Sequence, residues 1–259
     1  MPSSIPKSEI INRLQDENPW WVSGEVDTLY QKMTRRLYFE SFYPYVKKGD
    51  VRRAVVLMGP KRVGKTIMMF HTIDQLLKEG VAPQNLIFVG IDNPIYINLG
   101  LKDILQLVKE ALKREDLKDS YVFFEGIQYL KDWQRHLKTL VDSFPEIKFI
   151  VSGSAAAALN WYSSESGAGR FTNFMLPPLT FQEYIHLKKL NNLVYEDSII
   201  YNDVKVPQYL ARDLKVLNKE FVNYLNYGGY PEVVLSETIQ SDMRRYVKSG
   251  VANLARTLS

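Results

Sequence analysis

Short apolar segments alternate with amphipathic segments between residues 51 and 179. The apolar segments span residues 51–58, 86–91, 120–125, 147–152 and 173–176. They are continuous apolar runs, which is typical of strands covered on both faces of a parallel sheet. Apolar residues recur at helical spacing between them, at residues 65–79, 102–113, 130–142 and near 154–161. The pattern predicts a doubly wound α/β domain with a five-stranded parallel sheet.

The pattern changes on both sides of this domain, which we expect to span residues 51–179. Residues 1–50 are predicted to form a helical lead-in packed on the core. Trp20 and Trp21 either pack this lead-in on the domain or form a partner-binding patch, and packing is favoured because large aromatic side chains supply buried area. After about residue 178 the alternation stops, and residues 180–259 are predicted to be a helical, lid-like appendage.

Residues 59–66 read GPKRVGKT and match the phosphate-binding loop pattern G-x-x-x-x-G-K-[ST]. A predicted strand leads into the loop and a predicted helix follows it, so the positive end of a helix faces an anion. We expect Lys65 to reach the β- and γ-phosphates of ATP and the Thr66 hydroxyl to bind Mg²⁺. The side chains of Lys61 and Arg62 are expected to be solvated. The predicted nucleotide-binding residues are Gly59, Pro60, Lys61, Arg62, Val63, Gly64, Lys65, Thr66 and Ile67.

The apolar strand YVFFE ends at Glu125, where P-loop ATPases carry the acid that holds the magnesium shell. Alternatively, Glu125 simply ends a strand. The next residue is Gly126, where hydrolysing members of this branch carry a glutamate that polarises the attacking water. General-base assistance is worth about 10²–10⁴-fold in rate, so the Glu125–Gly126 pair predicts slow hydrolysis unless another residue substitutes. Asp92, beside Asn93 at the end of the second predicted strand, is the nearest alternative carboxylate.

Two further segments hold candidates for contact with the γ-phosphate. Ser152 and Ser154 end the fourth predicted strand, where they either sense the phosphate or begin a helix with serine as its cap. Arg170 follows a glycine just before the last strand. It either presents its guanidinium to a γ-phosphate, in cis or from a neighbouring subunit, or pairs with a carboxylate such as Glu165. An arginine finger is worth about 10³–10⁵-fold in rate.

Composition narrows the classes of function. The 259-residue chain has a net charge of +4 and no cysteine, which excludes disulfides and thiolate metal sites and is compatible with a reducing cytoplasm. The three histidines, His71, His136 and His186, are too far apart to indicate a zinc site. We expect neither a membrane span nor a secretory signal, because no apolar run is long enough. The pI of about 9.0 permits contact with nucleic acid but does not require it.

Taken together, the motifs resemble the AAA-14 type ATP-binding proteins, which are prokaryotic AAA+-superfamily ATPases related to the archaeal ATPase and STAND-like groups. The resemblance covers about residues 20–250. It is carried in order by GPKRVGKT, YVFFEGIQYLKDWQRHLKTLVD, IVSGSAAAAL, SSESGAGRFTNFMLPPLTFQEY and YGGYPEVV. It implies an ATPase that uses Mg²⁺, with Glu125 as the metal acid, Ser154 in the sensor segment and Arg170 as a finger-like arginine.

The chain departs from that family in two places. The family's Asp-Glu-Ile-Gln reads Glu-Gly-Ile-Gln at residues 125–128, and the chain stops at Ser259, where family members commonly continue into a domain of unknown function. We therefore expect a nucleotide-driven switch with weak hydrolysis that acts through a homo-oligomer or a partner protein. The alternative is an active ATPase with Asp92 as a relocated base, acting on nucleic acid.

Overall fold

The computed structural model describes residues 5–47, 53–96, 98–154, 169–236 and 238. The chain divides into two compact units, Met1–Pro177 and Pro178–Ser259. The lead-in thus belongs to the first unit, and the division falls beside the expected start of the appendage at residue 180.

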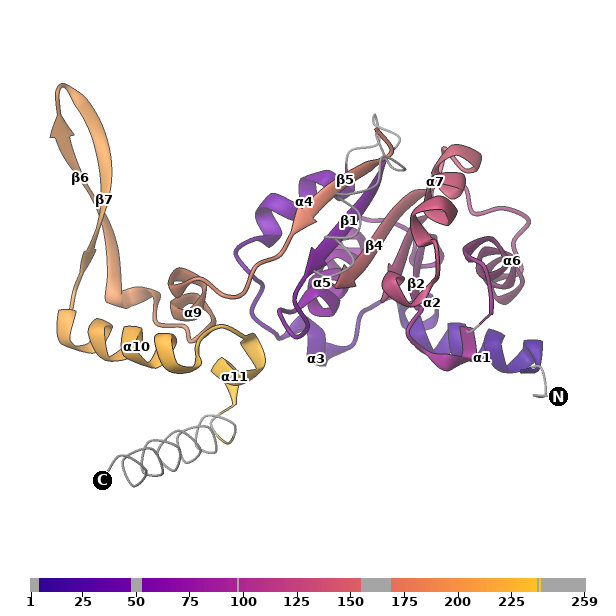
Figure 1. Ribbon diagram of the computed structural model, residues 1–259, viewed down its shortest axis with the longest axis horizontal. Helices are drawn as coiled ribbons and strands as arrows, with labels where there is room; N and C mark the ends of the chain where they lie inside the picture. The colour runs from indigo at the N-terminus through magenta and orange to yellow at the C-terminus, as the bar shows by residue number, and fades with distance from the viewer. Residues whose placement is uncertain (1–4, 48–52, 97, 155–168, 237, 239–259) are drawn as a thin grey trace, which may run out of the picture. The chain divides into compact units, whose positions relative to one another are not determined.

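The first unit is built on a five-stranded, wholly parallel sheet, as the apolar runs predicted (Figure 1). The strands lie in the order β2-β3-β4-β1-β5. Because β4 lies between β1 and β3, the strand before the phosphate loop and the strand that ends at Glu125 are not neighbours. The strands are β1 (Ala54–Gly59), β2 (Leu86–Gly90), β3 (Tyr121–Glu125), β4 (Lys148–Ser154) and β5 (Phe171–Met175).

The crossover helices α5 (Lys65–Lys78), α6 (Leu101–Leu112) and α7 (Trp133–Ser143) lie close to their predicted ranges. Their apolar faces join the strands in one continuous core. Short 3₁₀ helices at Pro83–Asn85, Pro94–Tyr96 and Ile127–Tyr129 complete the connections in this unit. The helix predicted near 154–161 lies outside the described residues.

The lead-in forms the helices α1 (Lys7–Glu17), α2 (Trp20–Ser23), α3 (Thr28–Gln31) and α4 (Phe39–Lys47). Trp20 and Trp21 are only 1% and 9% exposed, so they pack the lead-in on the domain rather than forming an exposed patch.

The lead-in also completes the hydrogen bonding of β2, which lies at one edge of the sheet. Both indole N–H groups of Trp20 and Trp21 donate to the carbonyl of Leu86, at 2.9 and 2.8 Å. The Asn18 amide donates to the carbonyl of Phe88 at 2.8 Å and accepts from its N–H at 2.6 Å. An exposed edge strand would present unpaired backbone groups. Here side chains of the lead-in take the place of a sixth strand.

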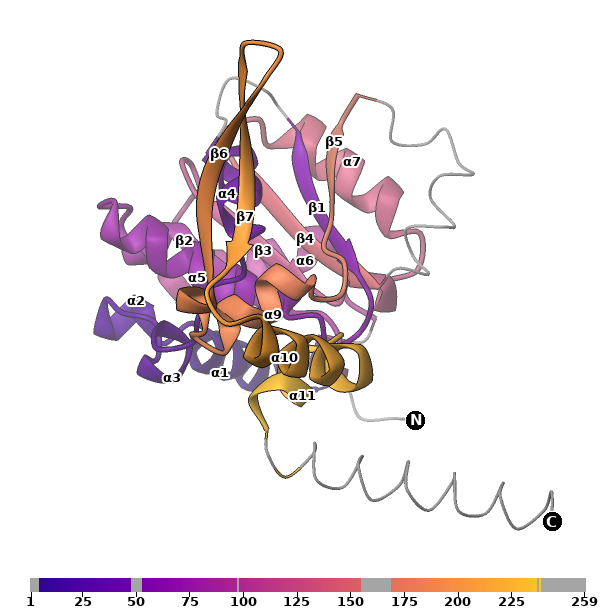
Figure 2. The ribbon, with the colours of Figure 1, turned by 90° about the vertical axis from the view of Figure 1, so that its left-hand side faces the viewer.

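The second unit contains α9 (Phe181–Leu187), α10 (Leu214–Tyr227), α11 (Pro231–Leu235) and a 3₁₀ helix at Asn191–Leu193. Contrary to the expectation of a helical appendage, residues 194–211 form an antiparallel hairpin of β6 (Val194–Tyr201) and β7 (Val204–Ala211). Figures 1 and 2 show it as a twisted two-stranded ribbon. The strands are rich in β-branched and aromatic residues. They are joined by Asn202 and Asp203, whose positive φ angles of 49° and 60° suit a two-residue hairpin turn.

Candidate nucleotide-binding site

The phosphate loop follows β1 at the carboxyl edge of the sheet, and α5 begins directly after it. Two glycines of the loop occupy positions where a larger residue would be strained, one because of its backbone conformation and the other because of a close contact. Gly64 adopts φ 96° and ψ 24°, a left-handed conformation that favours glycine. A side chain at Gly59 would collide with the carbonyl oxygen of Leu176. The conformation of the loop and its packing therefore explain why glycine occupies both of these positions of the motif.

Arg36 supports the loop from the lead-in, a role that no sequence pattern indicated. Its side chain is buried, with 6% exposed. Its guanidinium donates to the carbonyl of Val63 at 2.5 Å and to that of Pro177 at 3.0 Å. Because a guanidinium presents its donors in a fixed fork, Arg36 ties the loop to the chain just beyond β5.

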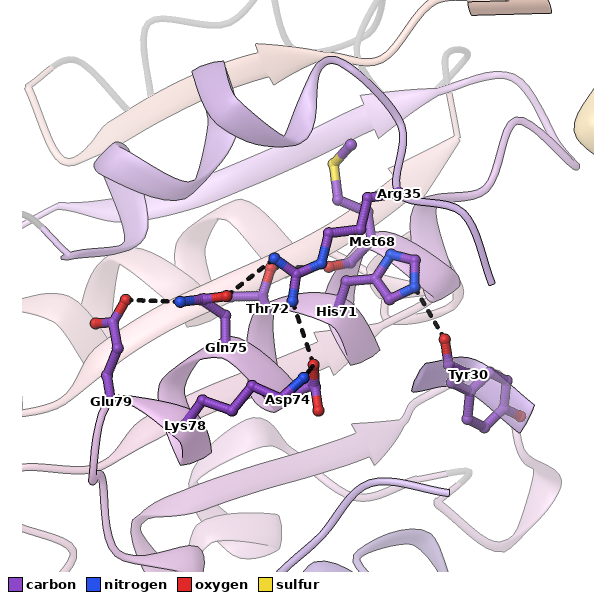
Figure 3. Close-up of polar contacts among 9 residues, drawn as sticks. All are labelled: Tyr30, Arg35, Met68, His71, Thr72, Asp74, Gln75, Lys78 and Glu79. Carbon is purple, nitrogen blue, oxygen red and sulfur yellow. Dashed lines mark hydrogen bonds and ion pairs between the residues drawn. The ribbon is translucent and has the colours of Figure 1, made fainter. Parts of the chain in front are cut away.

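The lead-in also fixes α5, the helix whose N-terminus faces the loop (Figure 3). Arg35 donates to Gln75 at 2.9 Å and forms an ion pair with Asp74 at 3.2 Å. The His71 ring nitrogen lies 3.0 Å from the carbonyl oxygen of Tyr30. Burial lowers the pKa of His71, so the ring favours its neutral form. These contacts fix the position of α5 relative to the segment that precedes β1.

Lys65, Thr66 and Glu125 meet at the carboxyl edge of the sheet. The ammonium of Lys65 donates to the carbonyls of Gly59 and Pro60, at 2.9 and 2.7 Å. The hydroxyl of Thr66 donates to the carboxylate of Glu125. The loop, the start of α5 and the end of β3 are thus brought together across the intervening strand β4.

Burial affects the pKa of two charged groups in the site, Lys65 and Glu125. Burial lowers the pKa of Lys65, and the nearby Glu125 carboxylate opposes this shift. Burial also raises the pKa of Glu125; the hydrogen bond from Thr66 opposes the rise, and the negative charges of Asp92 and Glu17 add to it. Desolvation disfavours the charged form of each group. A bound phosphate would place a negative charge beside Lys65, and its metal ion would place a positive charge beside Glu125. Each opposite charge would favour the charged form of its neighbour.

Glu17 is a member of this acidic group that the sequence did not reveal. It ends α1, and its side chain is only 6% exposed. It accepts from Arg13 at 2.8 Å, from the Tyr96 hydroxyl at 2.8 Å and from the N–H of Gly90 at 3.4 Å. From the sequence, Glu17 was recognisable only as part of a predicted helix, and that prediction did not show what the helix packs against.

The two serines of β4 have different positions. Ser154 pairs in register with Gly59, at the edge where the phosphate loop begins. Its N–H donates to the side-chain carbonyl of Gln128 at 3.2 Å, which joins the end of β4 to the segment after Glu125. Ser152 is buried beside Leu57 within the sheet. Of the two, Ser154 lies beside the loop and Ser152 does not.

Arg170 lies at the opposite edge of the sheet. Its carbonyl accepts from the N–H of Ala54, the first residue of β1. A strand advances about 3.3 Å per residue, so the end of β1 lies about 17 Å from its start. Arg170 forms an ion pair with Asp142 at 2.9 Å, whereas the expected alternative partner, Glu165, lies outside the described residues. The structure therefore does not bring Arg170 to the phosphate loop of its own chain.

Gly126 adopts a backbone conformation that few other residues tolerate, with φ 72° and ψ 34°. A Cβ atom at this position would lie 3.1 Å from the Cβ of Asp92 and 3.3 Å from a ring carbon of Tyr129. A glutamate at position 126, as in the family pattern, would meet both obstacles.

We predict that Gly126→Ala lowers the free energy of unfolding by more than the left-handed conformation alone costs, which is about 1–2 kcal/mol. The added loss comes from the close approach of the new Cβ to Asp92. Gly24→Ala is the matched control, because Gly24 has a φ of 75° and no atom within 4 Å of an added Cβ. Denaturant unfolding of both variants measures the difference; equal losses would show that the contact with Asp92 has no energetic effect.

The strand order, the phosphate loop and the acid at the end of β3 define the first unit as a P-loop nucleotide-binding domain of the α/β class. The AAA_14 family model, described as "AAA domain", matches residues 51–185, which is more than half of the chain. The chain belongs to this family of AAA domains.

Similar proteins include an uncharacterized protein of Haemophilus influenzae, 23% identical over 197 residues, which cover 76% of this chain and 43% of that protein. Uncharacterized protein MJ1544 of Methanocaldococcus jannaschii is 26% identical over 198 residues, which cover 76% of this chain and 40% of that protein. The chain thus spans less than half the length of these relatives.

Two solved structures are similar in fold. One is the Aeropyrum pernix ORC1 protein in complex with DNA, with a TM-score of 0.46 and 11% identity, covering 100% of this chain and 71% of that one. The other is C. elegans PCH-2, with a TM-score of 0.48 and 12% identity, covering 91% and 72%. At these values the likeness says nothing about activity or partners. Among the described residues, no helix is long and apolar enough to cross a membrane.

Proposed function

We propose that this chain binds ATP together with Mg²⁺ and acts as a nucleotide-driven switch that hydrolyses ATP slowly. The observation that supports the proposal is the meeting of Lys65, Thr66 and Glu125 at the carboxyl edge of the sheet, beside a loop shaped by Gly59 and Gly64. Lys65 would exchange its two loop carbonyls for phosphate oxygens. Ligands of open α/β sheets bind at this edge.

The residues present fit a magnesium ion that is shared with the substrate. Thr66 and Glu125 contact each other through oxygen atoms, which are the ligands that Mg²⁺ prefers. No cluster of three or more acidic, histidine or cysteine side chains that could hold a metal occurs in the described ranges. Mg²⁺ at nucleotide sites is usually held by one or two protein groups together with substrate phosphate oxygens. When bound, the ion would neutralise charge on the phosphates.

Slow turnover is expected because Gly126 has no side chain and therefore no carboxylate that could polarise the attacking water. Arg170 lies at the edge of the sheet away from the phosphate loop of its own chain. We therefore propose that it acts on the phosphates bound by a neighbouring subunit, which requires a homo-oligomer. Action on nucleic acid has only the net charge of +4 behind it and is not part of the proposal.

Titration of the purified chain with ATP, at saturating Mg²⁺ and in its absence, tests the proposal. We expect ATP binding that Mg²⁺ strengthens. Thr66→Ala should lose the strengthening by Mg²⁺, because it removes the hydroxyl, whereas the control Thr66→Ser should retain it. The proposal is wrong if the folded wild-type chain binds no ATP with Mg²⁺ present.

A further inference from the structure

A cavity of about 460 Å³ lies beside Glu125 in the first unit. Its wall includes the ends of β2 and β3 and the end of α1, which contribute Asp92, Glu125 and Glu17. The acid expected to hold the magnesium shell therefore shares this wall with four other carboxylates, Asp16, Glu17, Asp27 and Asp92. Asp92 is exposed on this wall, so water reaches its carboxylate.

The Cβ of Asp92 lies close to the position that the Cβ of a side chain at residue 126 would occupy. A Cβ on Gly126 would lie only 3.1 Å from the Cβ of Asp92 and 3.3 Å from its backbone nitrogen. The two positions are adjacent because the N–H of Ile91 donates to the carbonyl of Glu125, which extends the pairing of β2 and β3 by one step. A carboxylate at residue 92 thus enters the space beside Glu125 from the neighbouring strand.

Gly90 makes room for this carboxylate. A Cβ on Gly90 would lie 3.3 Å from Asp92 Oδ1 and 3.3 Å from Glu17 Oε1. Gly90 pairs in register with Glu125, so the cleared space lies directly beside the end of β3. The absence of side chains at residues 90 and 126 lets Asp92 lie between the two strand ends.

Two of the other carboxylates on this wall, Glu125 and Glu17, are already engaged. Glu125 accepts from Thr66, and Glu17 accepts from Arg13, Tyr96 and the N–H of Gly90. The carboxylate of Asp92 makes no hydrogen bond or ion pair within the part of the chain that the structure describes, and the residue is exposed. Asp92 can therefore accept a hydrogen bond from water without losing a structural contact.

We propose that Asp92 is the general base of ATP hydrolysis and takes the role of the glutamate missing at residue 126. This inference rests on the proposed ATP site. The water oxygen attacks the γ-phosphorus, and the bond from that phosphorus to the oxygen bridging to the β-phosphate breaks. ADP leaves with the bonding electron pair, while the water proton passes to the carboxylate of Asp92 and then to the released phosphate. The hydrolysis that remains without a glutamate at residue 126 is thus expected to depend on Asp92.

The test compares wild type with Asp92→Asn, which keeps the size of the side chain and removes its basicity. Asp16→Asn is the matched control, because Asp16 lies on the wall of the same cavity, is exposed and undergoes the same change of charge. Four quantities are measured with Mg²⁺ present: ATP affinity, the single-turnover rate of phosphate release, the ratio of ATP to ADP on protein separated from unbound nucleotide, and the unfolding midpoint.

We expect Asp92→Asn to lower the rate of phosphate release by about 10²–10⁴-fold and to leave ATP affinity and the unfolding midpoint unchanged. The separated variant should carry ATP where wild type carries ADP, and Asp16→Asn should behave as wild type. Release by Asp92→Asn at the wild-type rate would overturn the inference, as would wild type that binds ATP and never releases phosphate. In both cases the proposed binding of ATP with Mg²⁺ stands, although the second result would also contradict slow hydrolysis. Wild type that binds no ATP would overturn both proposals.

Discussion

Replacing Lys65 with alanine is expected to reduce ATP affinity by about 30- to 4,000-fold, which corresponds to about 2–5 kcal/mol for truncating one partner of a buried, hydrogen-bonded charge pair. Lys65 is half-buried, and its ammonium has two loop carbonyls as its hydrogen-bond partners. Phosphate oxygens would offer this partly dehydrated cation much stronger partners than neutral carbonyls do. Without the lysine, the phosphates would meet only the backbone N–H groups and the helix N-terminus.

Equilibrium titration with a fluorescent ATP analogue measures the loss. Lys102→Ala is the matched control, because it removes the same charge from an exposed position near the start of α6. It should bind the analogue as wild type does. Unchanged affinity in folded Lys65→Ala would contradict the assignment of residues 59–66 as the phosphate loop.

The second large effect is expected on stability. Asn18→Ala should lower the free energy of unfolding by about 1–3 kcal/mol for each backbone group that is left buried and unpaired. Asn18 is 1% exposed, and its amide pairs with both the N–H and the carbonyl of Phe88. Alanine can replace neither bond, so both groups of the edge strand lose their partner.

Denaturant unfolding followed by tryptophan fluorescence reports this change, since Trp20 and Trp21 lie in the same packed segment. Asn12→Ala removes an amide from the exposed side of α1 and serves as the control. Its midpoint should stay close to that of wild type. An equal loss in both variants would mean that the pairing with Phe88 has no special part in stability.

Local sequence patterns predicted most of the first unit. The apolar runs predicted β1 and β2 clearly, because strands covered on both faces need apolar side chains at every position. The run was less complete for the edge strand β5, where buried positions alternate with less buried ones. The glycines of the phosphate loop and the lysine and threonine after them were recognisable because their roles depend on neighbours in the chain. Glu125 was found through its place at the end of a strand, and it does lie beside Thr66.

The hairpin of the second unit shows where such patterns are harder to interpret. Its strands carry the β-branched and aromatic residues typical of strands, but polar residues are interspersed and most positions are exposed. No core imposes a clear alternation on such a ribbon, so composition alone did not separate it from the helices around it.

Arg170 and Asp92 show what depends on the arrangement of strands. In the sequence, Arg170 was a candidate for any γ-phosphate, but parallel pairing with β1 places it at the edge away from the loop of its own chain. Asp92 is far from Gly126 in the sequence, yet pairing of β2 with β3 brings their Cβ positions within 3.1 Å. The distance between two such residues is set by strand order and register.

The class of fold, the phosphate-loop motif and the acid at the end of β3 could thus be recognised without a structure, because each depends on residues that are adjacent in the chain or on one periodic pattern. The folded chain was needed to show how the lead-in covers β2 through Asn18, how Arg36 holds the loop, and which carboxylates share the cavity beside Glu125. Those contacts join segments that are distant in the chain. Their energies depend on burial and geometry, which appear only when the sheet has formed.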